Sequence, residues 1–181
     1  MLAVSTLAIV GCGKGPAPET TSLNQKIAPG ETTEFQDAEK VTRDFLSAML
    51  RGDDAKLRSL LTPLARAKGE EQGIPFSPPA SDTASFTINS IDTQGDQGAY
   101  VTSTLVDKNP DGENESAEII WVVAKTNEGW RIAGAAVSLF EGMPPTIINF
   151  EDPEAAKKAI ADTEADATRA ARKASTMPNR Q

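Results

Sequence analysis

The spacing of apolar residues changes once along the chain, near residue 86, from a helical period to a strand period. Before that point Val41, Phe45 and Met49 follow one another at intervals of four residues, which is typical of an amphipathic helix. Beyond it, apolar and polar residues alternate, which is typical of a β-strand with one buried face. The change predicts helices first and a sheet afterwards. The predicted helices cover residues 37–51, 53–61 and 64–72.

Four strands are predicted after residue 86, separated by turns that are rich in glycine, asparagine and proline. The third strand, AEIIWVVAK, is apolar over nearly its whole length, so we expect it to lie centrally and to be covered on both faces. Three helices followed by four antiparallel strands indicate an α+β fold, with the helices packed on one face of a curved sheet. The predicted strands cover residues 86–91, 100–106, 117–125 and 130–137.

The composition excludes several classes of protein. The chain of 181 residues contains no histidine and only one cysteine, Cys12, and its formal net charge is −8. These counts exclude a Ser-His-Asp triad, a Cys-His pair, a histidine- or cysteine-ligated zinc site, an iron–sulfur cluster and an internal disulfide. The acidic balance argues against binding to nucleic acid. We expect no cofactor, no metal and no enzymatic activity.

The single cysteine ends an apolar leader. Residues 2–11 are apolar or small and uncharged, and ten such residues are about half of a bilayer span. This length is too short for a transmembrane helix and suits the apolar region of a signal peptide, residues 1–11. The run Ile9-Val10-Gly11-Cys12 resembles a bacterial lipobox, which implies cleavage before Cys12 and a diacylglycerol on its thiol. The alternative is a buried Cys12 in a short apolar strand or helix.

Residues 12–36 are expected to carry the lipidated cysteine and a flexible linker. The linker is rich in glycine, proline, serine and threonine, so it cannot bury enough surface to offset the entropy of ordering. As a flexible chain it would span roughly 25–30 Å. The resemblance to a lipoprotein implies anchoring to a membrane at its periplasmic or extracellular face. Gly13 directly after the cysteine favours the outer membrane.

Three short motifs resemble a known superfamily. They are Leu50-Arg51-Gly52-Asp53 after the first helix, Leu60-Leu61-Thr62-Pro63 before the third, and Gly129-Trp130-Arg131-Ile132 in the last strand. Together with the order of the elements they resemble, over residues 37–140, the nuclear-transport-factor-2-like superfamily and its lipoprotein members of unknown function. The resemblance implies a curved antiparallel sheet wrapped round the first long helix, as a cone with a pocket at its open end. A cystatin-like domain without a real pocket is the alternative.

Residues 37–150 form the predicted domain, because eight of the nine aromatic residues lie there and large aromatic residues dominate core burial. Near its end, residues 143–152 are expected to form an extended arm laid over the domain. Residues 151–181 follow as a polar, alanine-rich tail, in which Asp152-Pro153-Glu154 predicts the start of a helix. Its stripe of mostly small residues would bury little surface, so a solvated helix is expected. Docking on the domain or on a partner is the alternative.

Aromatic and acidic side chains supply the candidates for a site. The residues predicted to line the pocket are Phe45, Tyr100, Trp121 and Trp130, with packing in the core as the alternative for both tryptophans. Without histidine, acid–base catalysis would need a carboxylate whose pKa burial has raised. Solvated positions at the rim are the alternative for the carboxylates on the predicted strands, which are Asp92, Asp107 and Glu118.

Charge is distributed unevenly along the domain. Residues 37–72 carry no net charge, whereas residues 73–150 hold ten acidic and three basic residues, a net charge of −7. The sheet half would therefore repel anions, so any ligand of the pocket is expected to be small and neutral or cationic. The sequence favours a membrane-anchored lipoprotein with a non-catalytic binding or scaffolding domain. The alternatives are a small enzyme that uses one pocket carboxylate and a structural envelope protein that forms homodimers through its sheet.

Overall fold

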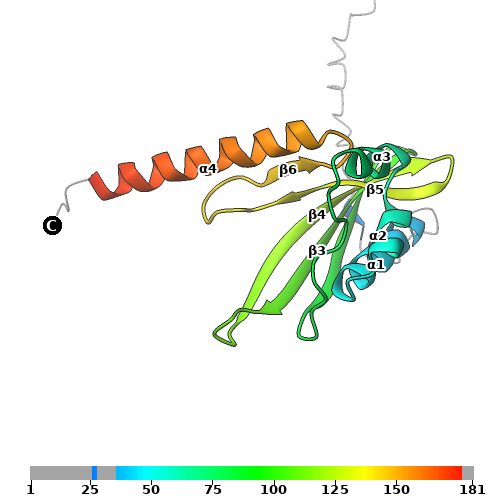
Figure 1. The fold of residues 1–181 in the computed structure, drawn as a ribbon, viewed down its shortest axis with the longest axis horizontal. Helices are drawn as coiled ribbons and strands as arrows, with labels where there is room; N and C mark the ends of the chain where they lie inside the picture. Colours follow the sequence, from blue (N-terminus) through cyan, green and yellow to red (C-terminus); the bar gives the residue numbers. More distant parts are fainter. Residues whose placement is uncertain (1–25, 28–35, 177–181) are drawn as a thin grey trace, which may run out of the picture.

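Four helices and six strands form an α+β fold in the part of the chain that this computed structural model describes, residues 26–27 and 36–176 (Figure 1). The predicted signal peptide, Cys12 and most of the linker lie outside the described residues. The helices are α1 (Gln36–Leu50), α2 (Asp54–Leu60), α3 (Pro63–Glu71) and α4 (Pro153–Thr176). The strands are β1 (Lys26–Ile27), β2 (Ser85–Gln94), β3 (Gly98–Lys108), β4 (Asn114–Thr126), β5 (Gly129–Val137) and β6 (Thr146–Asn149).

The six strands form one antiparallel sheet in which every strand pairs with its neighbours along the chain, in the order β1 to β6. The four predicted strands correspond to β2, β3, β4 and β5, so the α+β class is confirmed. The two edge strands β1 and β6 were not predicted, because strands of two and four residues are too short to show a period of two. Strand β1 falls inside the predicted linker, and β6 falls inside the predicted arm.

The ends of the first three helices follow from local chemistry. Gly52 follows α1 with a φ of +65°, a left-handed conformation that glycine adopts without steric cost. The carboxylate of Asp53 caps α2 by accepting a hydrogen bond from the Lys56 N–H (3.0 Å). Thr62 caps α3 in the same way through the Ala65 N–H (3.2 Å), and Pro63 occupies the first helical position.

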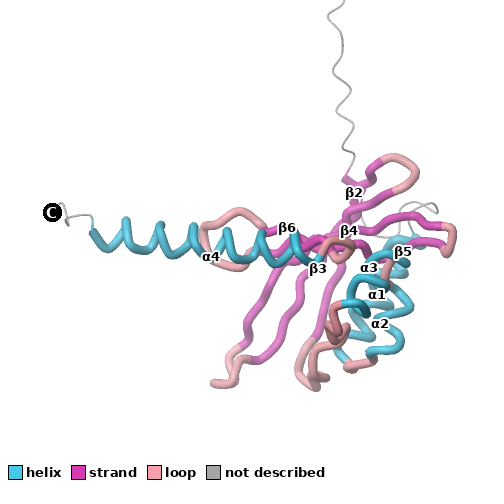
Figure 2. Tube along the Cα trace, turned by 45° about the horizontal axis from the view of Figure 1, so that its top comes forward, coloured by secondary structure: helices cyan, strands magenta, loops and turns pink. Residues whose placement is uncertain are grey.

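The core lies between α1–α3 and one face of the sheet, here called the inner face (Figure 2). Leu46 of α1, Leu57 of α2 and Ile132 of β5 are completely buried there. The expectation that β4 is covered on both faces is wrong for its outer side, where Ile120 and Val122 are only half-buried. Helices α1, α2 and α3 all pack on the inner face of the sheet, so none of these three covers the outer face of β4.

The tail combines the two alternatives that the sequence left open. The first three turns of α4 dock on the domain: Ala156 is buried, and the hydroxyls of Thr146 in β6 and Thr163 in α4 lie 2.9 Å apart. Farther along, α4 projects away from the sheet, and its side chains are almost all exposed (Figure 1). Within the described residues no helix is both long and apolar enough to cross a membrane.

Candidate functional site

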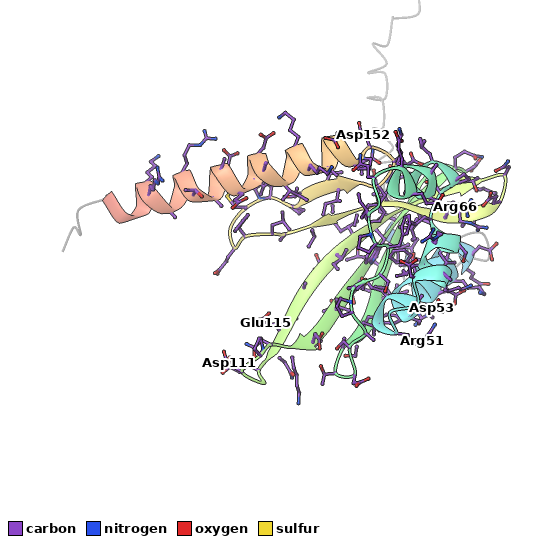
Figure 3. All side chains as sticks on the ribbon, in the orientation of Figure 1. Arg51, Asp53, Arg66, Asp111, Glu115 and Asp152 are labelled. Carbon is purple, nitrogen blue, oxygen red and sulfur yellow. The ribbon has the colours of Figure 1, made fainter. Side chains whose placement is uncertain are left out.

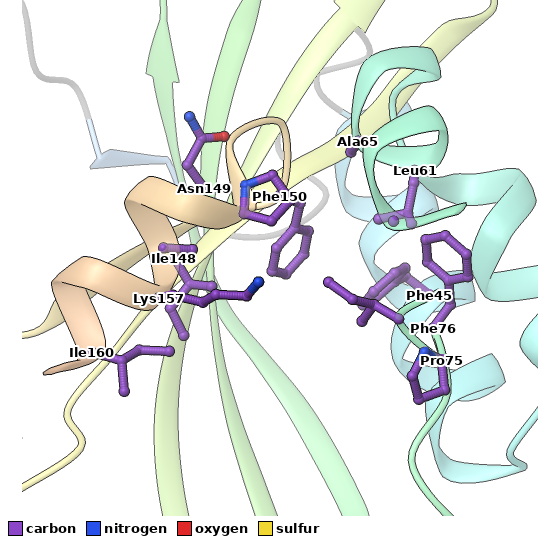
Figure 4. A pocket seen from close by; sticks show the side chains of 14 residues that line it. Phe45, Leu61, Ala65, Pro75, Phe76, Ile148, Asn149, Phe150, Lys157 and Ile160 are labelled. Carbon is purple, nitrogen blue, oxygen red and sulfur yellow. The ribbon is translucent and has the colours of Figure 1, made fainter. Parts of the chain in front are cut away.

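An apolar cavity of about 270 Å³ lies between two walls on the inner side of the domain (Figure 4). One wall comes from α1, α3 and the segment that follows α3; the other comes from β6 and the first two turns of α4. Three phenyl rings and three isoleucines dominate the lining: Phe45, Phe76, Phe150, Ile74, Ile148 and Ile160. The residues of the two walls are far apart in sequence, so the cavity exists only in the folded domain.

Phe76 reaches the first wall because of Gly69 and Asp54. A Cβ atom on Gly69 would lie 2.4 Å from Cε1 of Phe76, so only glycine at this position lets the ring lie against α3. The Asp54 carboxylate accepts a hydrogen bond from the Phe76 N–H (3.0 Å), and the Arg58 guanidinium lies 4.8 Å from the centre of the Phe76 ring. Hydrogen bonding from Arg58, with a smaller contribution from the Phe76 N–H, holds the pKa of Asp54 below its ordinary value.

Hydrogen bonds fix the segment between β6 and α4, which belongs to the second wall, to β5 and to the start of α3. The Phe150 N–H donates to the Ala133 carbonyl of β5 (3.0 Å). The Thr62 hydroxyl donates to the Glu151 carboxylate (2.7 Å) while it also caps α3. The Asp152 carboxylate then caps α4 through the Ala155 N–H (3.0 Å), which sets the direction in which α4 leaves the sheet.

The cavity is closed at one end and open at the other. Ala65 and Phe45, at the closed end, are 2% and 5% exposed, whereas Ile74 and Ile160 are 39% and 38% exposed. Three polar side chains join α3 to α4 beside the cavity, and one of them, Lys157, lines it. Lys157 Nζ donates to Gln72 Oε1 (3.0 Å) and to Glu154 Oε1 (2.9 Å), and Gln72 Nε2 donates to the same Glu154 oxygen (3.2 Å). We call Gln72, Glu154 and Lys157 the polar rim.

The four aromatic residues predicted to line the pocket lie in different parts of the structure. Phe45 lines the cavity. Trp121 lies in the core beside it, with ring centroids 5.2 Å apart and its indole N–H donating to Ser103 Oγ (2.9 Å). Trp130 is buried beneath Lys125 and borders a separate, polar hollow formed by α1, α2 and β5. Tyr100 lies on the outer face of the sheet and is 40% exposed.

The candidate carboxylates lie outside the cavity. Asp107 accepts hydrogen bonds from the hydroxyls of Thr83 (2.6 Å) and Ser81 (3.1 Å). The bond from Thr83 is the main reason that the pKa of Asp107 lies below its ordinary value, opposite to the shift that a general base near neutral pH needs. Glu118 is exposed in β4, and Asp92 lies in β2 opposite Tyr100. The only polar residues in the cavity lining, as far as the described residues show, are Asn149 and Lys157.

Acidic residues cluster at the tip of the β3–β4 hairpin, where Asp111 and Glu115 lie far from the helices (Figure 3). All residues from 111 to 118 are exposed. Within the described parts of the chain, no three acidic or thiol side chains are close enough together to hold a metal ion.

The outer face of the sheet carries an apolar patch. The strand register brings Tyr100, Val122, Ile120, Ala136 and Ile147 to this face, where they border a shallow groove. Ile147 is 67% exposed, the largest value among the exposed large apolar residues of the described segments. This patch is the kind of surface that pairing of two sheets would require.

Sequence analysis missed most of the cavity lining. Phe76, Phe150 and Ile160 were not nominated, because periodicity identifies only residues that share a face of one element. A weak signal was present. Phe76 and Phe150 are large aromatic residues in segments without a period, so they must bury against something other than their own helix or strand.

Comparison with known proteins adds no constraint on the function. No family model matches the chain, and no curated protein matches it significantly. Function is therefore inferred from the cavity, its polar rim and the N-terminal sequence.

Proposed function

We propose that this chain is a membrane-anchored lipoprotein whose domain binds a small apolar ligand without catalysis. The observation that carries the proposal is the cavity between α3 and α4, lined almost entirely by apolar side chains. Its 270 Å³ lies near the lower end of small-molecule sites, about 300–1,000 Å³, and well above the roughly 150 Å³ of a dry apolar cavity that binds benzene. A cavity of this size costs stability while it is empty, so an apolar ligand that fills it would offset that cost.

Binding is favoured over catalysis by the chemistry of the lining. The described residues that line the cavity include no carboxylate, hydroxyl or thiol, and their one amine, on Lys157, is paired with the Glu154 carboxylate, so none of them is a ready general base or nucleophile. A charged group buried among phenyl and isoleucine side chains would be costly. We therefore propose a ligand whose buried part is uncharged, in keeping with the acidic character of the sheet half.

The proposed family is the nuclear-transport-factor-2-like superfamily, for residues 37–150. Three features support it: the order of three helices followed by long antiparallel strands, the curvature of β3 and β4, and the packing of α1 on the inner face (Figure 1). A hollow on that inner side suits the cone that the resemblance implies.

Binding can be tested with 1-aminonaphthalene, an uncharged ten-carbon fluorophore that brightens in apolar surroundings. We expect saturable binding by the wild-type full chain and at least tenfold weaker binding by Ala156→Phe. Ala156 is buried and lines the cavity, so a phenyl ring there occupies the space that the ligand needs. The matched control is Ala170→Phe, an exposed position on the same helix, which should bind like wild type. Equal binding by Ala156→Phe and wild type, with both proteins folded, would contradict a ligand in this cavity.

The anchor is tested separately by fractionation of cells that express the full chain. We propose that Cys12 carries the lipid that holds the protein at the periplasmic or extracellular face of a membrane, with the outer membrane favoured. The wild-type chain is then expected in the membrane fraction, and Cys12→Ser in the soluble fraction. If the wild-type chain and Cys12→Ser associate with membranes to the same extent, the proposed anchor is contradicted. The proposal for the cavity is not affected by that result.

A second candidate function is a structural protein that forms homodimers through the outer face of its sheet. The apolar patch of Tyr100, Ile120, Val122, Ala136 and Ile147 favours it, because apolar area of this kind is what a self-complementary interface buries. Size-exclusion chromatography of the soluble domain distinguishes the two candidates: a dimer favours pairing through the sheet, and a monomer that binds the fluorophore favours the binding module.

A further inference from the structure

The cavity has the polarity of a site for an amphiphile. Its closed end, near Phe45 and Ala65, is apolar and buried. Polar groups that could reach a ligand headgroup gather where Lys157 lines the cavity, in the rim of Gln72, Glu154 and Lys157. The remaining polar lining residue, Asn149, already uses its side-chain oxygen to accept from the Glu151 N–H (2.9 Å). A ligand that matches this distribution of polar and apolar residues has an apolar part that fills the cavity and a polar group at one end.

The dimensions of the cavity set the size of the apolar part. The lining residues of α4 run from Pro153 to Ile160, seven steps that correspond to about 10 Å along the helix axis. By proportion to a cavity of roughly 150 Å³ that holds the six carbons of benzene, 270 Å³ holds about ten or eleven carbons. An extended alkyl chain of that size suits the length of α4 that lines the cavity.

The charges of the rim set the headgroup. The Lys157 ammonium is paired with the Glu154 carboxylate, so the rim carries no net charge. An anionic headgroup would gain little from the Lys157 ammonium, because Glu154 already neutralises it. Residues 73–150, which carry a net charge of −7, would repel the anion. A neutral hydroxyl or ester oxygen avoids that repulsion and can still accept a hydrogen bond from the Lys157 ammonium or the Gln72 amide.

We infer that the ligand of this cavity is a neutral amphiphile with a single linear alkyl chain of about ten carbons, whose oxygen headgroup lies at the polar rim. The inference rests on the proposed function, since it names the class of ligand for the same cavity. A fatty alcohol and the acyl chain of a neutral ester lipid share this chemistry.

The test is displacement of 1-aminonaphthalene from the wild-type full chain by a series of straight-chain alcohols from hexanol to dodecanol. Each buried methylene contributes about 0.8 kcal/mol, so affinity is expected to rise about fourfold per carbon and to level off near ten carbons. Decanol should bind at least tenfold more tightly than 1-adamantanol, a compact alcohol with the same number of carbons. It should also bind more tightly than decanoate and decylammonium. Methyl decanoate serves as the ester arm, and similar affinities for it and for decanol are expected.

The position of the headgroup is tested with two neighbouring lysines. Loss of one hydrogen bond costs about 0.5–1.5 kcal/mol, so Lys157→Ala is expected to weaken decanol two- to tenfold. Lys158→Ala is the matched control, because Lys158 pairs with Asp162 on the exposed side of α4 and does not line the cavity. Both positions are exposed, but Lys157→Ala also removes the bond to Gln72 at the end of α3, so urea denaturation of both variants is measured beside binding.

The outcomes separate this inference from the proposed function. The linear-chain ligand is overturned if the fluorophore binds but the affinity of the alcohols does not rise with chain length. It is also overturned if 1-adamantanol binds as tightly as decanol. In both cases the proposed binding module stands. If decanoate binds as tightly as decanol, the neutral headgroup is overturned. If neither the fluorophore nor any alcohol binds, both proposals fail together.

Discussion

Replacing Phe45 with alanine is expected to lower the free energy of unfolding by about 4 kcal/mol, the range typical of a buried phenylalanine. Phe45 is 5% exposed at the centre of α1 and packs against Trp121, with ring centroids 5.2 Å apart at an interplanar angle of 59°. Such tilted aromatic pairs add about 0.5–1.5 kcal/mol to the effect of burial. The ring also borders the cavity, so its removal would enlarge an existing void rather than leave a space that neighbours can fill.

Urea denaturation monitored by tryptophan fluorescence measures this loss, because Trp121 lies directly beside the substitution. Phe140→Ala is the control: Phe140 is 38% exposed between β5 and β6, and its removal is expected to cost less than about 1 kcal/mol. A loss below about 1 kcal/mol for Phe45→Ala would mean that the contact between α1 and β4 is not part of the stable core.

Replacing Gly134 with alanine is expected to loosen or detach β6, at a cost of about 3 kcal/mol, as found for overpacking against backbone. A Cβ atom on Gly134 of β5 would lie 2.6 Å from the Ile148 carbonyl oxygen and 3.4 Å from the Asn149 Cα atom. Both atoms belong to the backbone of β6, so no side-chain rotation relieves the clash. The strand carries Ile148 and leads into Phe150, so the second wall of the cavity would move with it.

Hydrogen exchange of the β6 amides, together with urea denaturation, measures this effect. Gly98→Ala in β3 is the matched control, because the nearest atoms to a Cβ there lie at 3.6 Å, which is ordinary contact. We expect Gly98→Ala to leave the exchange of β6 unchanged and Gly134→Ala to accelerate it and to weaken 1-aminonaphthalene binding. If the two variants are equally stable and bind equally, close packing of β5 against β6 is not what holds the second wall.

The elements of the fold were largely predictable because their signals are local. The four-residue spacing of Val41, Phe45 and Met49 reflects one face of α1, and Thr62-Pro63 marks the start of α3 by capping chemistry. Strand β6 was not predictable in this way. Its four residues form a strand only because β5 presents Gly134, which has no side chain, at the point of closest approach.

The site was much less predictable, for a related reason. Phe45 and Phe150 line one cavity although about a hundred residues separate them, and nothing local connects them. Trp121 and Trp130 were candidates for both core and pocket, and both are buried in the folded domain. The Trp121 indole nitrogen lies 2.9 Å from Ser103 Oγ, a hydrogen-bond partner that only tertiary packing supplies. Tyr100 went to the outer face because the pairing of β3 with β4 determines which side chains share a face.

By itself, the sequence determined the α+β class, the main helices and strands and the absence of histidine chemistry. These properties depend on composition and on patterns within about fifteen residues, which local physics controls. Only the tertiary structure decided that a cavity exists, that α4 forms one of its walls and that a polar rim of Gln72, Glu154 and Lys157 borders its mouth. Those properties depend on how far apart packed elements lie, and that distance is set by contacts between segments that the sequence keeps apart.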